Sequence, residues 1–203
     1  MPAEKVAGWL SEPVVVEEKL DGANVSLWLD PGAGRVEVAS RGGVGAQDRA
    51  GQLGRLRAWA AERTQALTGL LKGGWVLYGE WLWLQHGIRY DRLPDWLIAL
   101  DLWHEDRGFA PLEERDRRCR AAGLALPPRL FEGIVGDESG VRRLLAGSAL
   151  SSDQPVEGLV VRRADGQRCK VVADGHVRRS DADWAQERRH NDLRAAAAAT
   201  KEG

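Results

Sequence analysis

The sequence has little cysteine, no excess of charge of either sign and no long apolar run. Its two cysteines, Cys119 and Cys169, lie far apart without the spacing of metal ligands, which is typical of intracellular thiols rather than of a disulfide framework. With 29 basic and 30 acidic residues, any contact with nucleic acid must come from a local patch and not from the overall charge. No apolar run is long enough to span a membrane, and the N-terminus lacks a signal-peptide core. We therefore expect a cytoplasmic protein that does not enter a membrane.

The composition is that of a globular protein. Hydrophobic residues make up 43% of the 203 residues and charged residues 29%, which allows a sizeable core and excludes disorder over most of the chain. Nine tryptophans, several of them in strand-like segments, predict thick aromatic packing between sheets.

The apolar pattern predicts many strands and a few helices. Strands are expected over residues 14–16, 25–29, 35–39, 75–84, 96–103, 156–163 and 168–172. Helices are expected over residues 53–71, 111–123, 138–145 and 176–199. Strands dominate the middle of the chain, so the pattern favours an α+β domain over residues 1–173, followed by a helical tail over residues 174–203.

The stretch at residues 17–24, EEKLDGAN, lies between two strand-like runs. Asp-Gly is a frequent hairpin turn, so we expect the two runs to pair and to hold Lys19 at the end of a buried strand. Lysine is rarely buried unless its amine is paired or used. A salt bridge of Lys19 with Glu18 or Asp21 is the structural alternative to a chemical role.

Two carboxylates lie in apolar strands. Glu80 falls within the run WVLYGEWLWL, and Glu157 begins the run EGLVVR. A buried carboxylate without a partner is costly, so each needs a cation nearby. That cation is either a structural arginine or part of a binding site.

Residues 19–24, KLDGAN, resemble motif I of the covalent nucleotidyltransferases, the superfamily of ATP-dependent DNA ligases, RNA ligases and mRNA capping enzymes. Five further stretches resemble, in order, the arginine loop after motif I and motifs III, IIIa, IV and V; they are residues 40–42, 78–81, 97–102, 157–162 and 168–170. The resemblance covers residues 17–170. It implies an antiparallel-sheet adenylation (nucleotidyltransferase) domain with peripheral helices.

By this resemblance Lys19 is the nucleophile that takes AMP from ATP. A lysine in water has a pKa near 10.4, so its charged form must be disfavoured by burial or by nearby cations before it can attack phosphorus. Lys170, Arg41 and a divalent metal are the cations that the motifs offer.

The resemblance also implies roles for the other motif residues. Glu157 helps to hold a hydrated Mg²⁺ or Mn²⁺, and Glu80 binds the ribose hydroxyls or aids the metal. Lys170 neutralises charge on the departing pyrophosphate, unless it is only an exposed strand lysine. The expected nucleotide-binding residues are Glu18, Lys19, Asn24, Arg41, Glu80, Arg168 and Lys170.

Two positions depart from the superfamily pattern. Motif V usually has a lysine where this chain has Arg168, which makes Arg168 a less certain phosphate ligand. Motif IIIa usually offers an aromatic ring to the base, but Leu100 stands there. Trp96, Trp103 or an apolar sandwich are the candidates for that contact, which stays unassigned.

Asn24 and the pair Glu18-Lys19 resemble the RNA-ligase-2-like family most. DNA ligases and capping enzymes carry an oligonucleotide-binding barrel of roughly a hundred residues after motif V, and residues 171–203 are too few for one. We therefore expect no separate barrel; the tail resembles a remnant of the helical domain of such RNA ligases. Its arginines form either a solvated helix face or a phosphate-binding patch.

The resemblance thus implies an ATP-dependent RNA ligase that acts in RNA repair and joins 5′-phosphate to 3′-hydroxyl ends through lysyl-AMP and an adenylylated 5′ end. The expected cofactors are ATP and Mg²⁺ (or Mn²⁺), and the expected partner is RNA with such ends, either free or in a nicked duplex. A minimal ATP-dependent DNA nick ligase is one alternative. A nucleotide- or RNA-binding module that adenylates without sealing is the other.

Overall fold

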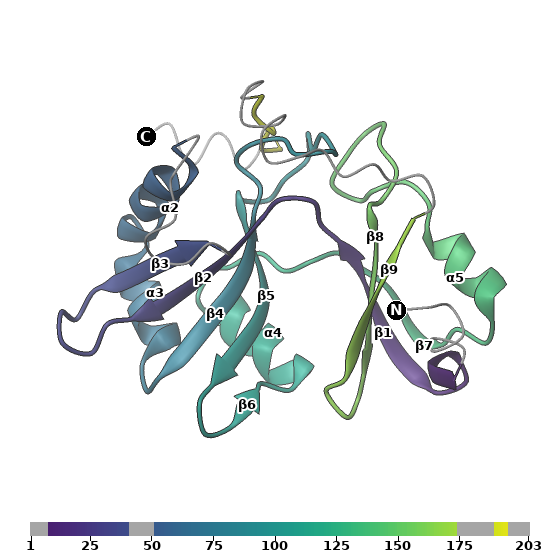
Figure 1. Cartoon of the computed structure of the whole chain (residues 1–203), viewed down its shortest axis with the longest axis horizontal. Coiled ribbons are helices and arrows are strands. Elements are labelled where there is room, and N and C mark those ends of the chain that lie inside the picture. The colour runs from purple at the N-terminus through teal and green to yellow at the C-terminus, as the bar shows by residue number, and fades with distance from the viewer. Residues whose placement is uncertain (1–7, 41–50, 174–188, 195–203) are drawn as a thin grey trace.

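Two antiparallel sheets face each other in this computed structural model, which describes residues 8–40, 51–173 and 189–194 (Figure 1). The four-stranded sheet has the order β7-β1-β8-β9, with β1 at Pro13–Lys19, β7 at Arg129–Ile134, β8 at Gly158–Arg163 and β9 at Arg168–Val172. The five-stranded sheet has the order β3-β2-β4-β5-β6, with β2 at Ala23–Leu29, β3 at Val36–Ser40, β4 at Trp75–Trp81, β5 at Leu97–His104 and β6 at Gly108–Phe109. The predicted α+β architecture is confirmed.

Helices cover the outer face of each sheet. Helices α2 (Gln52–Ala61) and α3 (Thr64–Leu71) bury leucines and Trp59 against the five-stranded sheet, and α4 (Leu112–Ala121) adds the buried Cys119 to the same core. Helix α5 (Glu138–Leu144) packs through Val141 on the four-stranded sheet. The inner faces are left to line the space between the sheets.

Most of the described tryptophans lie between a sheet and its helices, and not between the two sheets as predicted. Trp59 and Trp81 pack edge to face with their ring centroids 6.1 Å apart, and Trp96 packs on Trp81 at 6.4 Å. The predicted helix over residues 53–71 is divided at Arg63, whose guanidinium stacks on Trp59 and pairs with Asp95 at 3.4 Å.

The hairpin expected around Lys19 is not formed. Strand β1 belongs to the four-stranded sheet and β2 to the five-stranded sheet, so residues 20–22 cross from one sheet to the other. Gly22 is not among the glycines with positive φ; it is needed because a Cβ there would lie 2.7 Å from the backbone oxygen of Trp81. Another Asp-Gly pair, Asp165-Gly166, does form a hairpin turn, between β8 and β9, with Gly166 at φ +83°.

Strand β7 has no counterpart among the predicted strands. It follows Pro127-Pro128 and pairs only with β1, at the edge of the sheet. Its residues are largely half-buried or exposed, and Ile134 is 58% exposed, so the strand carries little of the apolar alternation that marks the others.

Residues 189–194 are extended, so the helix expected over residues 176–199 does not include them. Their backbone hydrogen bonds go to residues 83–93 and not to one another. Leu193 packs with Leu20, Tyr90 and Leu150 in a small third core beside the crossing between the sheets. None of the helices that the structure describes has both the length and the apolar character that a bilayer crossing requires.

Candidate active site

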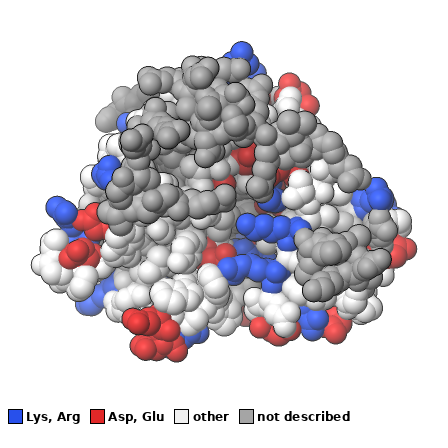
Figure 2. Space-filling view, in the orientation of Figure 1, with Lys and Arg blue, Asp and Glu red and all other residues white. Residues whose placement is uncertain are grey.

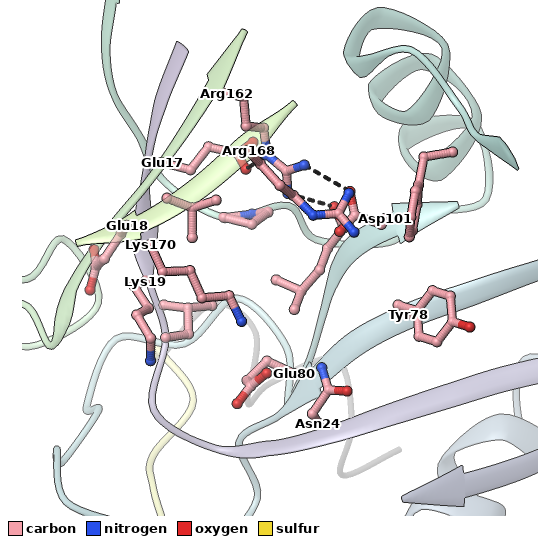
Figure 3. Close-up of a pocket in the computed structure, with 15 residues that line it drawn as sticks. Glu17, Glu18, Lys19, Asn24, Tyr78, Glu80, Asp101, Arg162, Arg168 and Lys170 are labelled. Atoms are coloured by element: carbon pink, nitrogen blue, oxygen red, sulfur yellow. Dashed lines mark hydrogen bonds and ion pairs between the residues drawn. The ribbon is translucent and has the colours of Figure 1, made fainter. Parts of the chain in front are cut away.

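A pocket of about 270 Å³ lies between the facing sheets (Figure 3). Six of the sequence-predicted site residues line it: Glu18, Lys19, Asn24, Glu80, Arg168 and Lys170. Glu157 contacts Lys19 directly, and Arg41 lies outside the described residues. In the space-filling view, Lys and Arg side chains gather near the centre of the visible face, where the two sheets meet (Figure 2).

Lys19 is the last residue of β1, is 9% exposed and lies opposite Gly158 of β8. Its ammonium forms an ion pair with the buried carboxylate of Glu157. Gly158 allows strand β9 to lie close to β8, because a Cβ there would lie 2.1 Å from the backbone oxygen of Val171. The partner of Lys19 is therefore a motif IV residue and not a sequence neighbour.

The two sequence neighbours have other partners. Glu18 accepts hydrogen bonds from the Ser148 hydroxyl and from the Ala149 N–H at 3.0 Å. Burial raises the pKa of the Glu18 carboxyl, and these two hydrogen bonds oppose the shift. Asp21 accepts the N–H groups of Gly87 and Ile88. Both carboxylates thus fix loops around the end of β1 that carries Lys19.

Glu80 lies on the five-stranded side of the pocket, opposite Asn24 in the β2–β4 ladder. Its Oε1 accepts the N–H of Gly22 at 3.0 Å. Burial raises the pKa of Glu80 to about 7, although the Lys19 ammonium and the Gly22 and Asn24 hydrogen bonds pull it down; the Glu157 carboxylate adds a further upward push. Glu80 therefore changes charge near neutral pH.

A buried ion network fastens the two sheets together beside the pocket. Glu17 of β1 pairs with Arg115 of α4 at 2.5 Å and with Arg162 of β8 at 2.7 Å. Asp101 of β5 pairs with Arg162 at 2.8 Å and with Arg168 of β9 at 3.2 Å. The sequence analysis missed this network. A glutamate amid valines at Glu17 was the available signal, but nothing in the spacing identifies its distant partners.

The two cations of motif V have different surroundings. Arg168 pairs with Asp101, and its guanidinium lies 3.9 Å from the ring centroid of Phe109. Lys170 extends its amine into the pocket and forms no ion pair with another described residue (Figure 3). Lys170 is therefore the motif V cation that is open to an anionic ligand.

Neither Trp96 nor Trp103 lines the pocket. Leu100 and Val160 line it from opposite sheets, which leaves the apolar sandwich as the candidate base contact. Tyr78 and Phe109 also line it, and the sequence analysis singled out neither ring. The identity of the base contact stays a prediction.

Glu80 and Glu157 fit a metal ion that takes most of its ligands from water and phosphate and few from the protein. Among the described residues no group of three His, Cys, Asp or Glu side chains could hold a metal ion. Glu80 and Glu157 are close enough for the charge of one to raise the pKa of the other. Mg²⁺ usually binds through one or two carboxylates, with water and phosphate oxygens as the remaining ligands.

Solved structures that resemble this chain include RNA ligases. The Naegleria gruberi RNA ligase with pyrophosphate superposes with a TM-score of 0.60 at 18% identity, covering 85% of this chain and 54% of that one. An archaeal ATP-dependent RNA ligase gives 0.56 at 19% identity, covering 80% and 43%. A variant of the Naegleria gruberi enzyme with ATP and Mn gives 0.56 at 16% identity, covering 86% and 55%. The fold is that of an RNA ligase adenylation domain.

The family follows from the sequence match. The family model for RNA ligase matches residues 12–177, which is most of the chain, so the protein belongs to the RNA ligase family. In sequence, no curated protein matches the chain. The chain spans about half the length of the structures it resembles.

Proposed function

We propose that the protein is an ATP-dependent RNA ligase that joins 5′-phosphate to 3′-hydroxyl ends. The observation that carries the proposal is the buried Lys19, held by Glu157 at the end of β1 in a pocket that Lys170 and Glu80 also line, in a chain of the RNA ligase family.

In the first step Lys19 Nζ loses a proton and attacks the α-phosphorus of ATP. The new bond joins nitrogen to phosphorus, the bond from phosphorus to the bridging oxygen breaks, and pyrophosphate leaves with its electron pair. Glu157 Oε1 contacts the ammonium and is placed to accept its proton. Burial at 9% exposure removes water from the reacting amine.

Lys170 holds the phosphates during this step. Its free amine reaches the pocket, whereas Arg168 is held by Asp101. Positive charge fixed beside the leaving group stabilises the charge that develops there. Glu80 and Glu157 would hold Mg²⁺ or Mn²⁺ together with phosphate oxygens, and the bound metal would neutralise phosphate charge.

The later steps transfer AMP from Lys19 to the 5′-phosphate of the strand. The 3′-hydroxyl of the other end then attacks that phosphate and releases AMP, so each sealed bond consumes one ATP. The strands are RNA ends, free or in a nicked duplex.

A module that adenylates itself without sealing is the second candidate. One observation favours it: Arg168, which stands where motif V usually has a lysine, is engaged by Asp101. A minimal DNA nick ligase is the third.

Self-labelling tests the proposal. The purified protein is incubated with Mg²⁺ and ATP labelled at the α-phosphate, and covalent label is measured on a denaturing gel. We expect label in the wild type and none in Lys19→Ala, with Lys72→Ala, an exposed lysine after α3, as the matched control that keeps its label. Label in Lys19→Ala would place the nucleophile elsewhere.

Nicked RNA, nicked DNA and hybrid duplexes with 5′-phosphates then separate the three candidates. Sealing of RNA ends supports the proposal, and preference for an all-DNA nick overturns it in favour of the DNA ligase. Label without sealing of any end supports the non-sealing module.

A further inference from the structure

The extended segment at residues 189–194 packs against the loop at residues 83–93 and lies beyond the residues that the family model matches. Its backbone forms hydrogen bonds with both ends of the loop at residues 83–93. The Arg189 oxygen accepts the Gln85 N–H at 2.8 Å, and the Asp192 N–H donates to the Tyr90 oxygen at 2.8 Å. Bridges join Leu84 to His190 and Leu93 to Leu193. We call residues 189–194 the strap.

Asn191 is the centre of the strap and is 4% exposed. Its Nδ2 donates to the backbone oxygens of Leu82 at 2.8 Å and Leu84 at 3.3 Å, and its Oδ1 accepts the Tyr90 N–H at 2.9 Å. One amide side chain thus satisfies three backbone groups of a loop that forms almost no regular structure of its own. Neither aspartate nor leucine can make both kinds of bond in this space.

The same loop holds the turn that carries the nucleophile. The Asp21 N–H donates to the Tyr90 hydroxyl at 2.9 Å, and Asp21 Oδ2 accepts the N–H of Ile88 at 3.0 Å. Tyr90 is fully buried, and its ring shares the third core with Leu20. A continuous path therefore runs from Asn191 through Tyr90 to Asp21, two residues after Lys19.

We infer that Asn191 is a positioning residue for the Lys19 nucleophile and acts through Tyr90 and the Asp21 backbone. Attack on phosphorus needs a fixed distance and direction, and a displacement of about 1 Å from a distant change can slow such a step about 100-fold. The strap does not line the pocket, so its loss alters how Lys19 is held and not how ATP is bound. The inference rests on the proposed lysyl-AMP chemistry and names a part of the chain on which it depends.

The test uses four variants of the full chain. Asn191→Ala removes the strap bonds, Tyr90→Phe removes only the hydroxyl that Asp21 uses, and the double variant combines them. Asp192→Asn is the matched control, because the Asp192 side chain is exposed and pairs only with the exposed Arg89 among the described residues. The rate of lysyl-AMP formation is measured in single turnovers across ATP concentrations.

We expect Asn191→Ala to lower the maximal rate about 10- to 100-fold and to leave the half-saturating ATP concentration within about twofold. Tyr90→Phe lowers the maximal rate in the same sense. The double variant is no slower than Asn191→Ala alone, because both changes break one path. Asp192→Asn keeps the wild-type rate. Three results would overturn the inference. The first is a wild-type maximal rate in Asn191→Ala, and the second is a change in the half-saturating ATP concentration alone. The third is a double variant whose loss of rate equals the product of the two single losses.

Hydrogen–deuterium exchange provides a second measurement that needs no activity. In Tyr90→Phe, which keeps its ring in the core, and in Asn191→Ala, we expect faster exchange over residues 17–24 and 84–93. Exchange in the β8–β9 hairpin stays unchanged. If the wild type takes no label from ATP, the proposed function fails, while the exchange pattern still decides whether the strap holds the Lys19 turn. Unchanged exchange over residues 17–24 in both variants contradicts the inference.

Discussion

Replacing Glu17 with glutamine tests whether the buried ion network holds the two sheets together. The Glu17 and Arg115 side chains are each 2% exposed, and Glu17 also pairs with Arg162. Glutamine keeps the shape but removes the negative charge and turns an NH₂ group toward two guanidinium groups. Burial lowers the Arg115 pKa, and Glu17 and Asp116 together raise it above its usual value. Because arginine does not lose its proton in proteins, Arg115 stays charged when one partner is lost.

Removing one partner of a buried pair costs about 3–5 kcal/mol. Arg115 keeps Asp116 and Arg162 keeps Asp101, so we expect the lower end, about 3 kcal/mol. For a chain of this size that corresponds to a fall in Tm of roughly 6–12 °C. A loss of about 3 kcal/mol is a large share of a typical free energy of unfolding, which is about 5–15 kcal/mol.

Urea unfolding and thermal melting measure this loss. Glu132→Gln is the control, because Glu132 pairs with Arg129 at the surface with its side chain 65% exposed, and we expect a change within about 0.5 kcal/mol. If Glu17→Gln unfolds within about 1 kcal/mol of the wild type, the network does not hold the sheets together and the reasoning is wrong.

Three further results are expected. Burial raises the pKa of Glu80 from 4.5 to about 7, so the stability that Glu80 contributes is complete below about pH 4.5 and is lost as the pH rises through about 7. In urea unfolding, the free energy of unfolding of the wild type should fall between these two pH values, and that of Glu80→Gln should not. Parallel pH profiles of the two proteins would contradict this prediction. Gly22→Ala should destabilise the fold by about 1–3 kcal/mol, because its Cβ would lie 2.7 Å from the backbone oxygen of Trp81. Gly69→Ala, in open space on α3, should be neutral or stabilising. Equal effects of the two variants in urea unfolding would refute the close-approach argument. Lys170→Ala should leave the unfolding free energy within about 0.5 kcal/mol and slow lysyl-AMP formation about 10²- to 10³-fold, and a rate within tenfold of the wild type would remove Lys170 from the phosphate site.

The strands were predictable from the sequence where one face is buried against helices. Strands β4, β5, β8 and β9 carry long apolar or alternating runs, because a half-buried strand needs them. Strand β7 was not predictable, since it lies at an edge and its pairing with β1 depends on residues far away in the sequence. The Asp21-Gly22 pair predicted a hairpin, because the local pattern does not reveal that the next strand joins another sheet.

The site was predictable in its motif residues and not in their support. Lys19, Glu80 and Lys170 line one pocket, as the motif order implied. The partners of Glu17 and Tyr90 could not be predicted from the sequence. Arg115 and Asn191 lie 98 and 101 residues away from them, and arginine and asparagine are common at protein surfaces. Local patterns identify the residues that gather in the pocket better than the buried polar groups that hold them in place.

The central place of β1 in its sheet has a consequence for the order of folding. Its neighbours β7 and β8 come from residues 129–134 and 158–163, whereas the five-stranded sheet joins segments from residues 23–109. Contacts between distant segments form slowly, because the entropy of closing a long loop is lost before the contacts contribute any stabilising energy. We therefore expect the five-stranded sheet and its helices to assemble early and β1 to pair last. During refolding, the ability to accept a nucleotide should appear only in the slowest phase, after most of the helical signal has returned.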